Sequence, residues 1–255
     1  MRLRNIVCMV IILVTHFSTI SPQSALAQQG GSGLRPVRIC TLFDHSASMA
    51  HFAIDLPSLD DTRPLQRLII RRGGSVAYGL IQENPSTSLL RETISAPEEG
   101  LTPPDQSTNV FARSKAKRLY EENLPIYEER ERSRIDSARV VIDAFEIRLG
   151  EFITAGAGKA NITDLWGNIR RCSSQLLEPI PYGHPEPDRY LLIISDGVHN
   201  LKGSEYEPVD DSITVLSVSG ARRIGATTKI GRRVLWFESA VAAINYIVAS
   251  AEVKN

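Results

Sequence analysis

Short apolar runs alternate along this chain with segments in which apolar residues recur every three or four positions. The runs predict buried strands at residues 37–43, 75–82, 89–95, 190–195, 212–218 and 234–237. The spaced patterns predict helices at residues 64–72, directly after Thr163, and at 239–249. Strands that alternate with helices favour an α/β fold: a doubly wound, mostly parallel sheet with helices on both faces.

One further helix is predicted in the middle of the chain. From Ala112 onward the sequence is charged and helix-favouring, and we expect Pro125 to break it. Beyond the proline, a single apolar stripe runs along a long helix through Ile135, Ala138, Ile142, Phe145, Leu149 and Phe152. The sign-alternating run 128–132 predicts a solvated face, with a partner-binding face as the alternative.

The first 27 residues have the pattern of a secretory signal peptide. Arg2 and Arg4 precede an apolar core, and Ala25 and Ala27 provide the small residues of a cleavage site after Ala27. The apolar run is too short for a membrane span of about 20 residues, so we expect export to the periplasm or the exterior without a stable span after cleavage. Removing Arg2 and Arg4 from 29 basic residues leaves 27 against 29 acidic ones, which argues against a nucleic-acid partner.

The rest of the chain divides into a short linker and one domain. Residues 28–34 are rich in glycine and predict flexibility, and residues 35–253 form the predicted domain. The region 96–132 is longer than a crossover between strands requires, so we expect it to be an insertion or a lid.

Hydroxyl and carboxylate side chains follow the first predicted strand. Asp44, Ser46 and Ser48 form a D-x-S-x-S turn, which by itself is equally typical of a turn or a helix cap. Two later turns add oxygen: Thr163 stands before a helix, and Asp196 ends a buried strand in Ser-Asp-Gly. Together they favour a site for Mg²⁺, or for Mn²⁺ or Ca²⁺, because these ions take oxygen ligands.

In order and spacing, these five residues resemble the von Willebrand factor type A (vWA) domain, whose metal-ion-dependent adhesion site combines D-x-S-x-S, a later Thr and the Asp of S/T-D-G. The resemblance implies a Rossmann-like vWA fold over about residues 35–253 and a metal site made of Asp44, Ser46, Ser48, Thr163 and Asp196. Asp164 competes with Thr163 as a ligand, but the family pattern has a hydroxyl there, and a carboxylate suits the start of a helix.

The resemblance further implies a non-catalytic module that binds a protein ligand, with an Asp or Glu carboxylate of the partner completing the metal's coordination. A metal-dependent phosphoester hydrolase is one alternative, although no second carboxylate cluster accompanies the site and the oxygen preference of Mg²⁺ argues against a role for His45 or His199. An envelope scaffolding component with a structural metal is another. The oligomeric state stays open.

Two cysteines remain after the leader and Cys8 are removed. In an exported chain, Cys40 and Cys172 could form a disulfide or remain two buried thiols. In the resembling fold, the helix that carries Cys172 packs over the central strands, next to the strand of Cys40.

Overall fold

The computed structural model describes residues 34–46, 48–49, 54–82, 89–104, 110–154, 162–180, 184–202, 205, 207–218 and 234–253. These residues all belong to one unit, residues 31–255. The predicted signal peptide, and the predicted linker apart from Leu34, lie outside the described residues.

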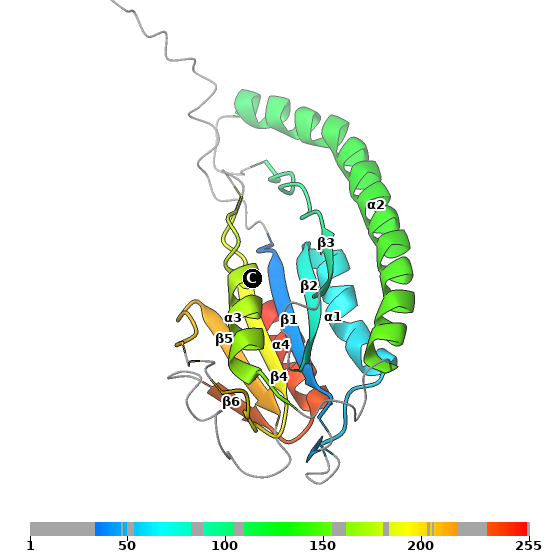
Figure 1. The fold of residues 1–255 in the computed structure, drawn as a ribbon. Helices are drawn as coiled ribbons and strands as arrows, with labels where there is room; N and C mark the ends of the chain where they lie inside the picture. Colours follow the sequence, from blue (N-terminus) through cyan, green and yellow to red (C-terminus); the bar gives the residue numbers. More distant parts are fainter. Residues whose placement is uncertain are drawn as a thin grey trace, which may run out of the picture. The chain divides into compact units, whose positions relative to one another are not determined.

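A six-stranded, mostly parallel sheet forms the centre of the fold (Figure 1). Its strands are β1 (Val37–Asp44), β2 (Gly74–Ile81), β3 (Leu90–Ile94), β4 (Asp188–Ile194), β5 (Ile213–Val218) and β6 (Val234–Phe237). They lie in the order β3-β2-β1-β4-β5-β6, and β3 pairs antiparallel to β2 at one edge. Each strand starts and ends within two residues of its prediction, and the predicted α/β class is confirmed.

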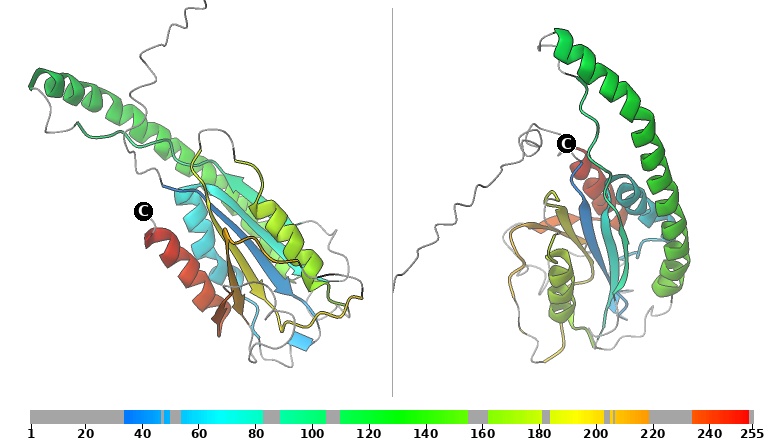
Figure 2. Two further views of the ribbon diagram at one scale, coloured as in Figure 1. Left: turned by 90° about the vertical axis from the view of Figure 1, so that its left-hand side faces the viewer. Right: turned by 90° about the horizontal axis from the view of Figure 1, so that it is seen from above.

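Helices cover both faces of this sheet (Figure 2). One face packs against α1 (Leu59–Arg72), α2 (Val110–Thr154) and α4 (Ala240–Val253), and the other against α3 (Leu165–Leu176). Strands β1 and β4 are buried on both faces, between the two apolar cores. Their sequences are therefore near-continuous apolar runs. None of the helices in the described part of the chain is long and apolar enough to span a membrane.

Helix α1 begins five residues before its predicted start. Ser58 is the N-cap: its hydroxyl accepts from the Asp61 backbone N–H, and the Asp61 carboxylate accepts from the Ser58 N–H at 2.8 Å. This capping box satisfies two backbone donors at the helix end, and Pro64 is tolerated in the second turn. The Ser58 to Asp61 spacing was the sequence signal for this earlier start.

Helix α2 is continuous over 45 residues, so the predicted break at Pro125 is wrong. A proline inside a helix removes one hydrogen bond and costs about 3 kcal/mol. Pro125 and Glu121 both lie in the exposed half of the helix, where water can hydrate the carbonyl that the proline leaves unpaired. The predicted stripe is confirmed, because Ala138, Ile142, Phe145 and Leu149 are buried.

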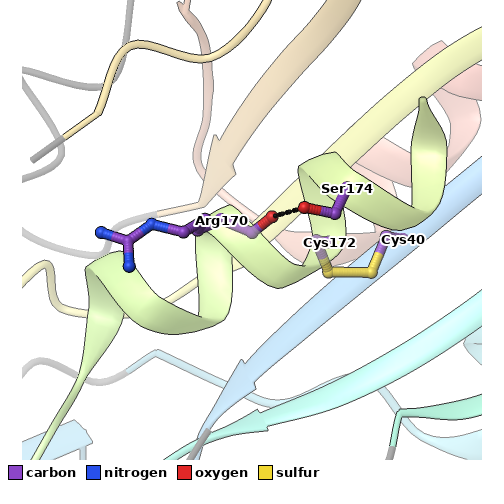
Figure 3. The surroundings of a disulfide bond; sticks show 4 residues. All are labelled: Cys40, Arg170, Cys172 and Ser174. Atoms are coloured by element: carbon purple, nitrogen blue, oxygen red, sulfur yellow. Dashed lines mark hydrogen bonds between the residues drawn. A yellow bond between two sulfur atoms is a disulfide. The ribbon is translucent and has the colours of Figure 1, made fainter. Parts of the chain in front are cut away.

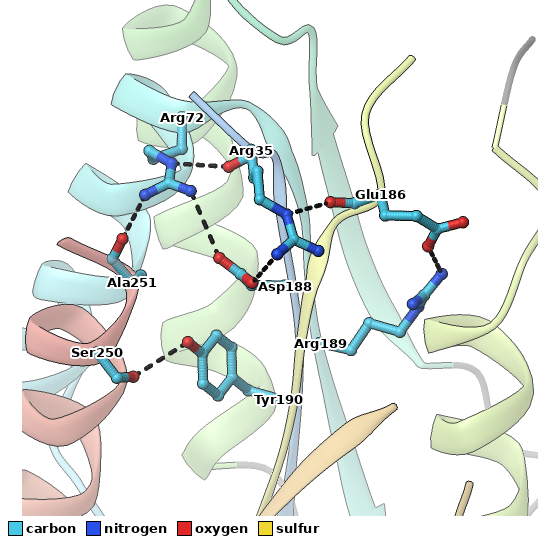
Figure 4. A network of polar contacts seen from close by, with 8 residues as sticks. All are labelled: Arg35, Arg72, Glu186, Asp188, Arg189, Tyr190, Ser250 and Ala251. Carbon is cyan, nitrogen blue, oxygen red and sulfur yellow. Dashed lines mark hydrogen bonds and ion pairs between the residues drawn. The ribbon is translucent and has the colours of Figure 1, made fainter. Parts of the chain in front are cut away.

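A buried ion pair holds the amino ends of the central strands (Figure 4). The Arg72 guanidinium, 1% exposed, lies 3.5 Å from Asp188 Oδ2 and donates to the Arg35 carbonyl at 2.7 Å and to the Ala251 carbonyl. Burial lowers the pKa of Arg72, and Asp188 opposes that change. The ends of α1 and α4 are thus joined to the starts of β1 and β4. The candidate site lies at the opposite end of these strands.

Candidate metal centre

The candidate site lies where β1 and β4 end side by side. Phe43 of β1 is in register with Ile194 of β4, so Asp44 and Ser195 leave the sheet next to each other. Strand β1 connects to β2 on one side, whereas β4 connects to β5 on the other. The chain therefore reverses its winding direction between them, which is where open α/β sheets place ligands.

The first turn holds the Asp44 carboxylate and two serine hydroxyls together. Asp44 is fully buried, and its Oδ1 accepts from the Ser46 N–H at 2.9 Å. The Ser46 and Ser48 hydroxyls lie 2.8 Å apart, and Ser48 is half-buried. Three of the predicted ligands are thus brought into one connected group.

The second turn, after β4, is hydrogen-bonded directly to the first. The Ser195 hydroxyl donates to Asp44 Oδ2 at 2.6 Å and accepts from the Gly197 N–H at 3.0 Å. Asp196 is 4% exposed, and its Oδ1 accepts from the Val198 N–H at 2.9 Å. Its Oδ2 is buried without a hydrogen-bond partner among the described residues, as expected of an oxygen that a cation would coordinate.

Thr163, on the third turn, is connected to the second through its backbone. Asn200 Oδ1 accepts from the Thr163 N–H at 2.6 Å, and the Thr163 carbonyl accepts from the Asn200 N–H at 3.3 Å. His199 Nδ1 accepts from the Leu165 N–H at 3.2 Å. The loop that carries Asp196 therefore also positions the residue predicted to be the fifth ligand.

Asp164 is the N-cap of α3 rather than a member of this group of oxygens. Its Oδ1 accepts from the Gly167 N–H at 2.9 Å, which satisfies one of the unpaired donors of the first helical turn. The capping role predicted for Asp164 agrees with this contact, and the metal-facing role of Thr163 stays a prediction.

The electrostatics of the site favour a bound cation. Burial raises the pKa of Asp44, and the negative charge of Asp196 raises it further, against hydrogen bonds from Ser195 and Ser46. Two buried carboxylates near each other are destabilising unless a positive charge joins them. Among the described residues, no three His, Cys, Asp or Glu side chains group closely enough to hold a metal.

A disulfide attaches the third turn's helix to the first turn's strand (Figure 3). Cys40 in β1 and Cys172 in α3 are bonded, with their Cα atoms 5.7 Å apart. This resolves the two alternatives left by the sequence in favour of the disulfide. Because α3 starts just after Thr163 and β1 ends at Asp44, the bond limits how far these two predicted ligands can separate.

The sequence pattern gave no supporting role to three residues: Ser195 and Asn200 were left unassigned, and His199 was considered only at the metal, where a role was argued against. Ser195 was part of the S-D-G motif but was not assigned a role, and the other two follow it in the same loop. Their contacts reach residues more than thirty positions away. Such contacts depend on how the strand ends meet.

Two solved structures of proximal thread matrix protein 1 from the mussel byssus are similar to this chain. A second crystal form of that protein has 10% identity and a TM-score of 0.36, covering 86% of this chain and 48% of its own. A structure described as having a zinc-occupied MIDAS motif has 10% identity and a TM-score of 0.33, covering 85% and 47%. The chain thus spans about half the length of these structures, and a similarity this low identifies no family.

Comparison of the sequence with family models finds no match, and comparison with curated proteins finds none either. The assignment of the site therefore depends on its own residues and contacts.

Proposed function

We propose that this protein is an exported, non-catalytic module of the vWA type that binds a protein ligand through a divalent cation. The ligand set is Asp44, Ser46, Ser48, Thr163 and Asp196, and the preferred ion is Mg²⁺, with Mn²⁺ or Ca²⁺ as substitutes. One observation carries the proposal: hydrogen bonds join three oxygen-bearing turns at neighbouring strand ends, and a buried oxygen of Asp196 has no donor within the part of the chain that the structure describes.

The donor set suits a hard cation. Two carboxylates and three hydroxyls match the oxygen preference of Mg²⁺, which keeps open or water-filled positions in its octahedral shell. Once bound, the ion would supply a position that a carboxylate of the partner can fill. The residues of the chain hold the oxygens in place: Ser195 orients Asp44, and Asn200 orients the Thr163 turn.

The first test is cation binding by calorimetry with Mg²⁺ and with Mn²⁺. The wild type should bind one ion per chain, and Asp44→Ala should bind none. Asp164→Asn is the matched control, because Asn also caps helices well and the variant removes a nearby carboxylate outside the proposed ligand set. Undiminished binding by Asp44→Ala, or loss of binding in Asp164→Asn but not in Thr163→Ala, would contradict the ligand assignment.

The second test concerns the partner. Capture of proteins from the native envelope fraction should depend on Mg²⁺, should fail with excess chelator, and should weaken with Ser46→Ala and with Thr163→Ala. Capture that persists in EDTA would exclude the adhesion-type function. Turnover of generic phosphoester substrates that requires both the metal and Asp44 would support the hydrolase alternative instead.

A further inference from the structure

The outward face of α2 carries apolar side chains that the domain leaves uncovered. Leu119, Ile126, Val140 and Ile147 are 44%, 52%, 70% and 70% exposed. They stand on a seven-residue spacing whose middle position is Ser133, which is also exposed. Positions seven apart differ by about 20° around a helix, so these five residues spread over about 80° and form one slowly winding stripe centred on Ser133.

This stripe lies on the side of α2 that faces away from the rest of the domain. The buried side of the helix carries Ala138, Ile142, Phe145 and Leu149, which pack into the core on α1's face of the sheet. Farther toward the amino end, the segment after β3 lies along α2, and Glu98 pairs with Arg130 at 3.5 Å. The outward face therefore stays accessible along the helix (Figure 1).

The amino-terminal half of α2 gains little from packing within its own chain. Residues 111–119 are all exposed, and Tyr120, Leu124 and Tyr127 are half-buried rather than buried. Ion pairs such as Lys117–Glu121 and Arg118–Glu122, at 3.7 and 3.5 Å, join exposed side chains and stabilise the helix only slightly. Most helical stability in proteins comes from packing of an apolar face, so a second surface that covers the stripe would stabilise this half.

The stripe is symmetric about Ser133. Leu119 and Ile147 stand 14 residues from it on either side, and Ile126 and Val140 stand seven residues away. A second α2 laid antiparallel across a two-fold axis at Ser133 would bring Leu119 opposite Ile147 of the other copy and Ile126 opposite Val140. Such an isologous contact uses the same patch twice, as two-fold dimers do.

The charges at the two ends of the stripe fit the same arrangement. Lys115 and Glu151 are both exposed and stand 18 residues from Ser133, on opposite sides. Eighteen residues make five turns, so all three lie on one line along the helix. In the antiparallel pair, Lys115 of each copy would therefore face Glu151 of the other, which provides opposite charges at both ends.

We propose that the outward face of α2 is a homodimer interface, in which two copies of this chain pair antiparallel through Leu119, Ile126, Ser133, Val140 and Ile147. The interface has one large apolar residue per two turns, so association is weak and depends on protein concentration. It is separate from the candidate metal centre and independent of the proposed function.

The test is the mass of the full chain by sedimentation equilibrium, over micromolar to millimolar concentrations and with EDTA present so that no cation bridges two copies. A monomer–dimer equilibrium is expected, and Ile126→Glu should shift it to monomer. Val241→Glu is the matched control, because Val241 on α4 is 44% exposed and lies outside the stripe. A monomer at every concentration, or equal loss of dimer in both variants, would overturn the proposal.

Charge reversal tests the antiparallel register. Lys115→Glu and Glu151→Lys should each weaken the dimer by a factor on the order of ten, and the double variant should restore it. Within one helix the two residues are about 54 Å apart at 1.5 Å per residue, so restoration cannot come from an intramolecular pair. Failure of the double variant to recover would exclude this register.

Cross-linking gives an independent measurement. Under mild oxidation, Ser133→Cys should form a disulfide dimer, because in the proposed arrangement Ser133 meets its own copy. Leu119→Cys should not, since Leu119 meets Ile147, and the unsubstituted chain serves as the blank. In a parallel pair Leu119 would also meet its own copy, so cross-linking of Leu119→Cys as efficiently as Ser133→Cys would indicate that arrangement and overturn the antiparallel proposal.

Discussion

The Ser195 hydroxyl donates a hydrogen bond to Asp44 Oδ2 at 2.6 Å, which links the ends of two strands separated by 151 positions in sequence. The Ser195 hydroxyl oxygen also accepts from the Gly197 N–H, so the hydrogen of this hydroxyl is directed at Asp44. Ser195 thus orients Asp44, a proposed metal ligand, without being a proposed ligand itself.

Ser195→Ala should therefore weaken Mn²⁺ binding about 10–100-fold, the usual cost of removing a group that orients a metal ligand. Ser217→Ala is the matched control: Ser217 is a buried serine near the end of β5, and its hydroxyl has no hydrogen-bond partner among the described residues. Calorimetry on both variants checks the prediction. Equal affinities in the two variants would show that the Ser195 contact does not support the site.

Asp44→Asn should stabilise the metal-free protein near neutral pH while abolishing cation binding. Burial, with the nearby charge of Asp196, raises the pKa of Asp44 above its ordinary value of 3.8. The folded state thus binds a proton more readily than the unfolded state, so the stability that Asp44 contributes increases as pH falls through the raised pKa toward 3.8. The stability difference between variant and wild type should shrink over that range.

Urea unfolding in EDTA at a series of pH values measures this difference. With Mn²⁺ at a hundredfold excess over its dissociation constant, the wild type should gain about 2.7 kcal/mol and Asp44→Asn nothing. Because metal competes with the proton on Asp44, the wild-type affinity should fall as pH decreases through the same range. If Asp44→Asn were less stable than the wild type at neutral pH in EDTA, the electrostatic explanation would be contradicted.

Removing the Cys40–Cys172 disulfide should destabilise the fold. The bond closes a loop with a sequence separation of 132, and the chain-entropy model assigns about 5 kcal/mol to a loop of that size. Measured losses for native disulfides are about 2–5 kcal/mol, which we expect for Cys40→Ala/Cys172→Ala by chemical denaturation. Cation affinity should also fall, because α3 presents Thr163. Unchanged stability after replacement would mean that the bond does not form.

Asp188→Ala should be among the most destabilising single substitutions, because it leaves the buried Arg72 guanidinium without its carboxylate. Breaking a buried pair in this way costs about 3–5 kcal/mol. Arg71→Ala is the control: its pair with Glu252 has side chains 53% and 50% exposed, and such exposed pairs contribute about 0–1 kcal/mol. Thermal unfolding of the two variants compares a buried with an exposed arginine pair, and similar losses would contradict the prediction.

Export should remove the leader after Ala27, so that the mature chain begins at Gln28. Small residues are required at the cleavage site, and Ala27→Tyr should leave the leader attached. Intact-mass spectrometry of the exported protein distinguishes the two forms. A wild-type chain that keeps residues 1–27 would instead indicate an uncleaved anchor.

Much of the fold was accessible from the sequence because its signals are local. Strands buried on both faces, such as β1 and β4, are short apolar runs whose limits are evident without knowledge of their neighbours. The five candidate ligands could be named because each follows a strand or precedes a helix in a recognisable motif. The sequence alone therefore determined the α/β class and nominated the residues of the site.

What the tertiary structure decided is how distant segments meet. Strand order places the end of β1 beside the end of β4, and this lets Ser195 reach Asp44 and Asn200 reach Thr163. Packing of α3 on β1 pairs Cys40 with Cys172. Helix α2 continues through Pro125 where that part of the helix is exposed to solvent. Each outcome depends on contacts or solvent exposure set by residues far away in the sequence, which local propensity does not encode.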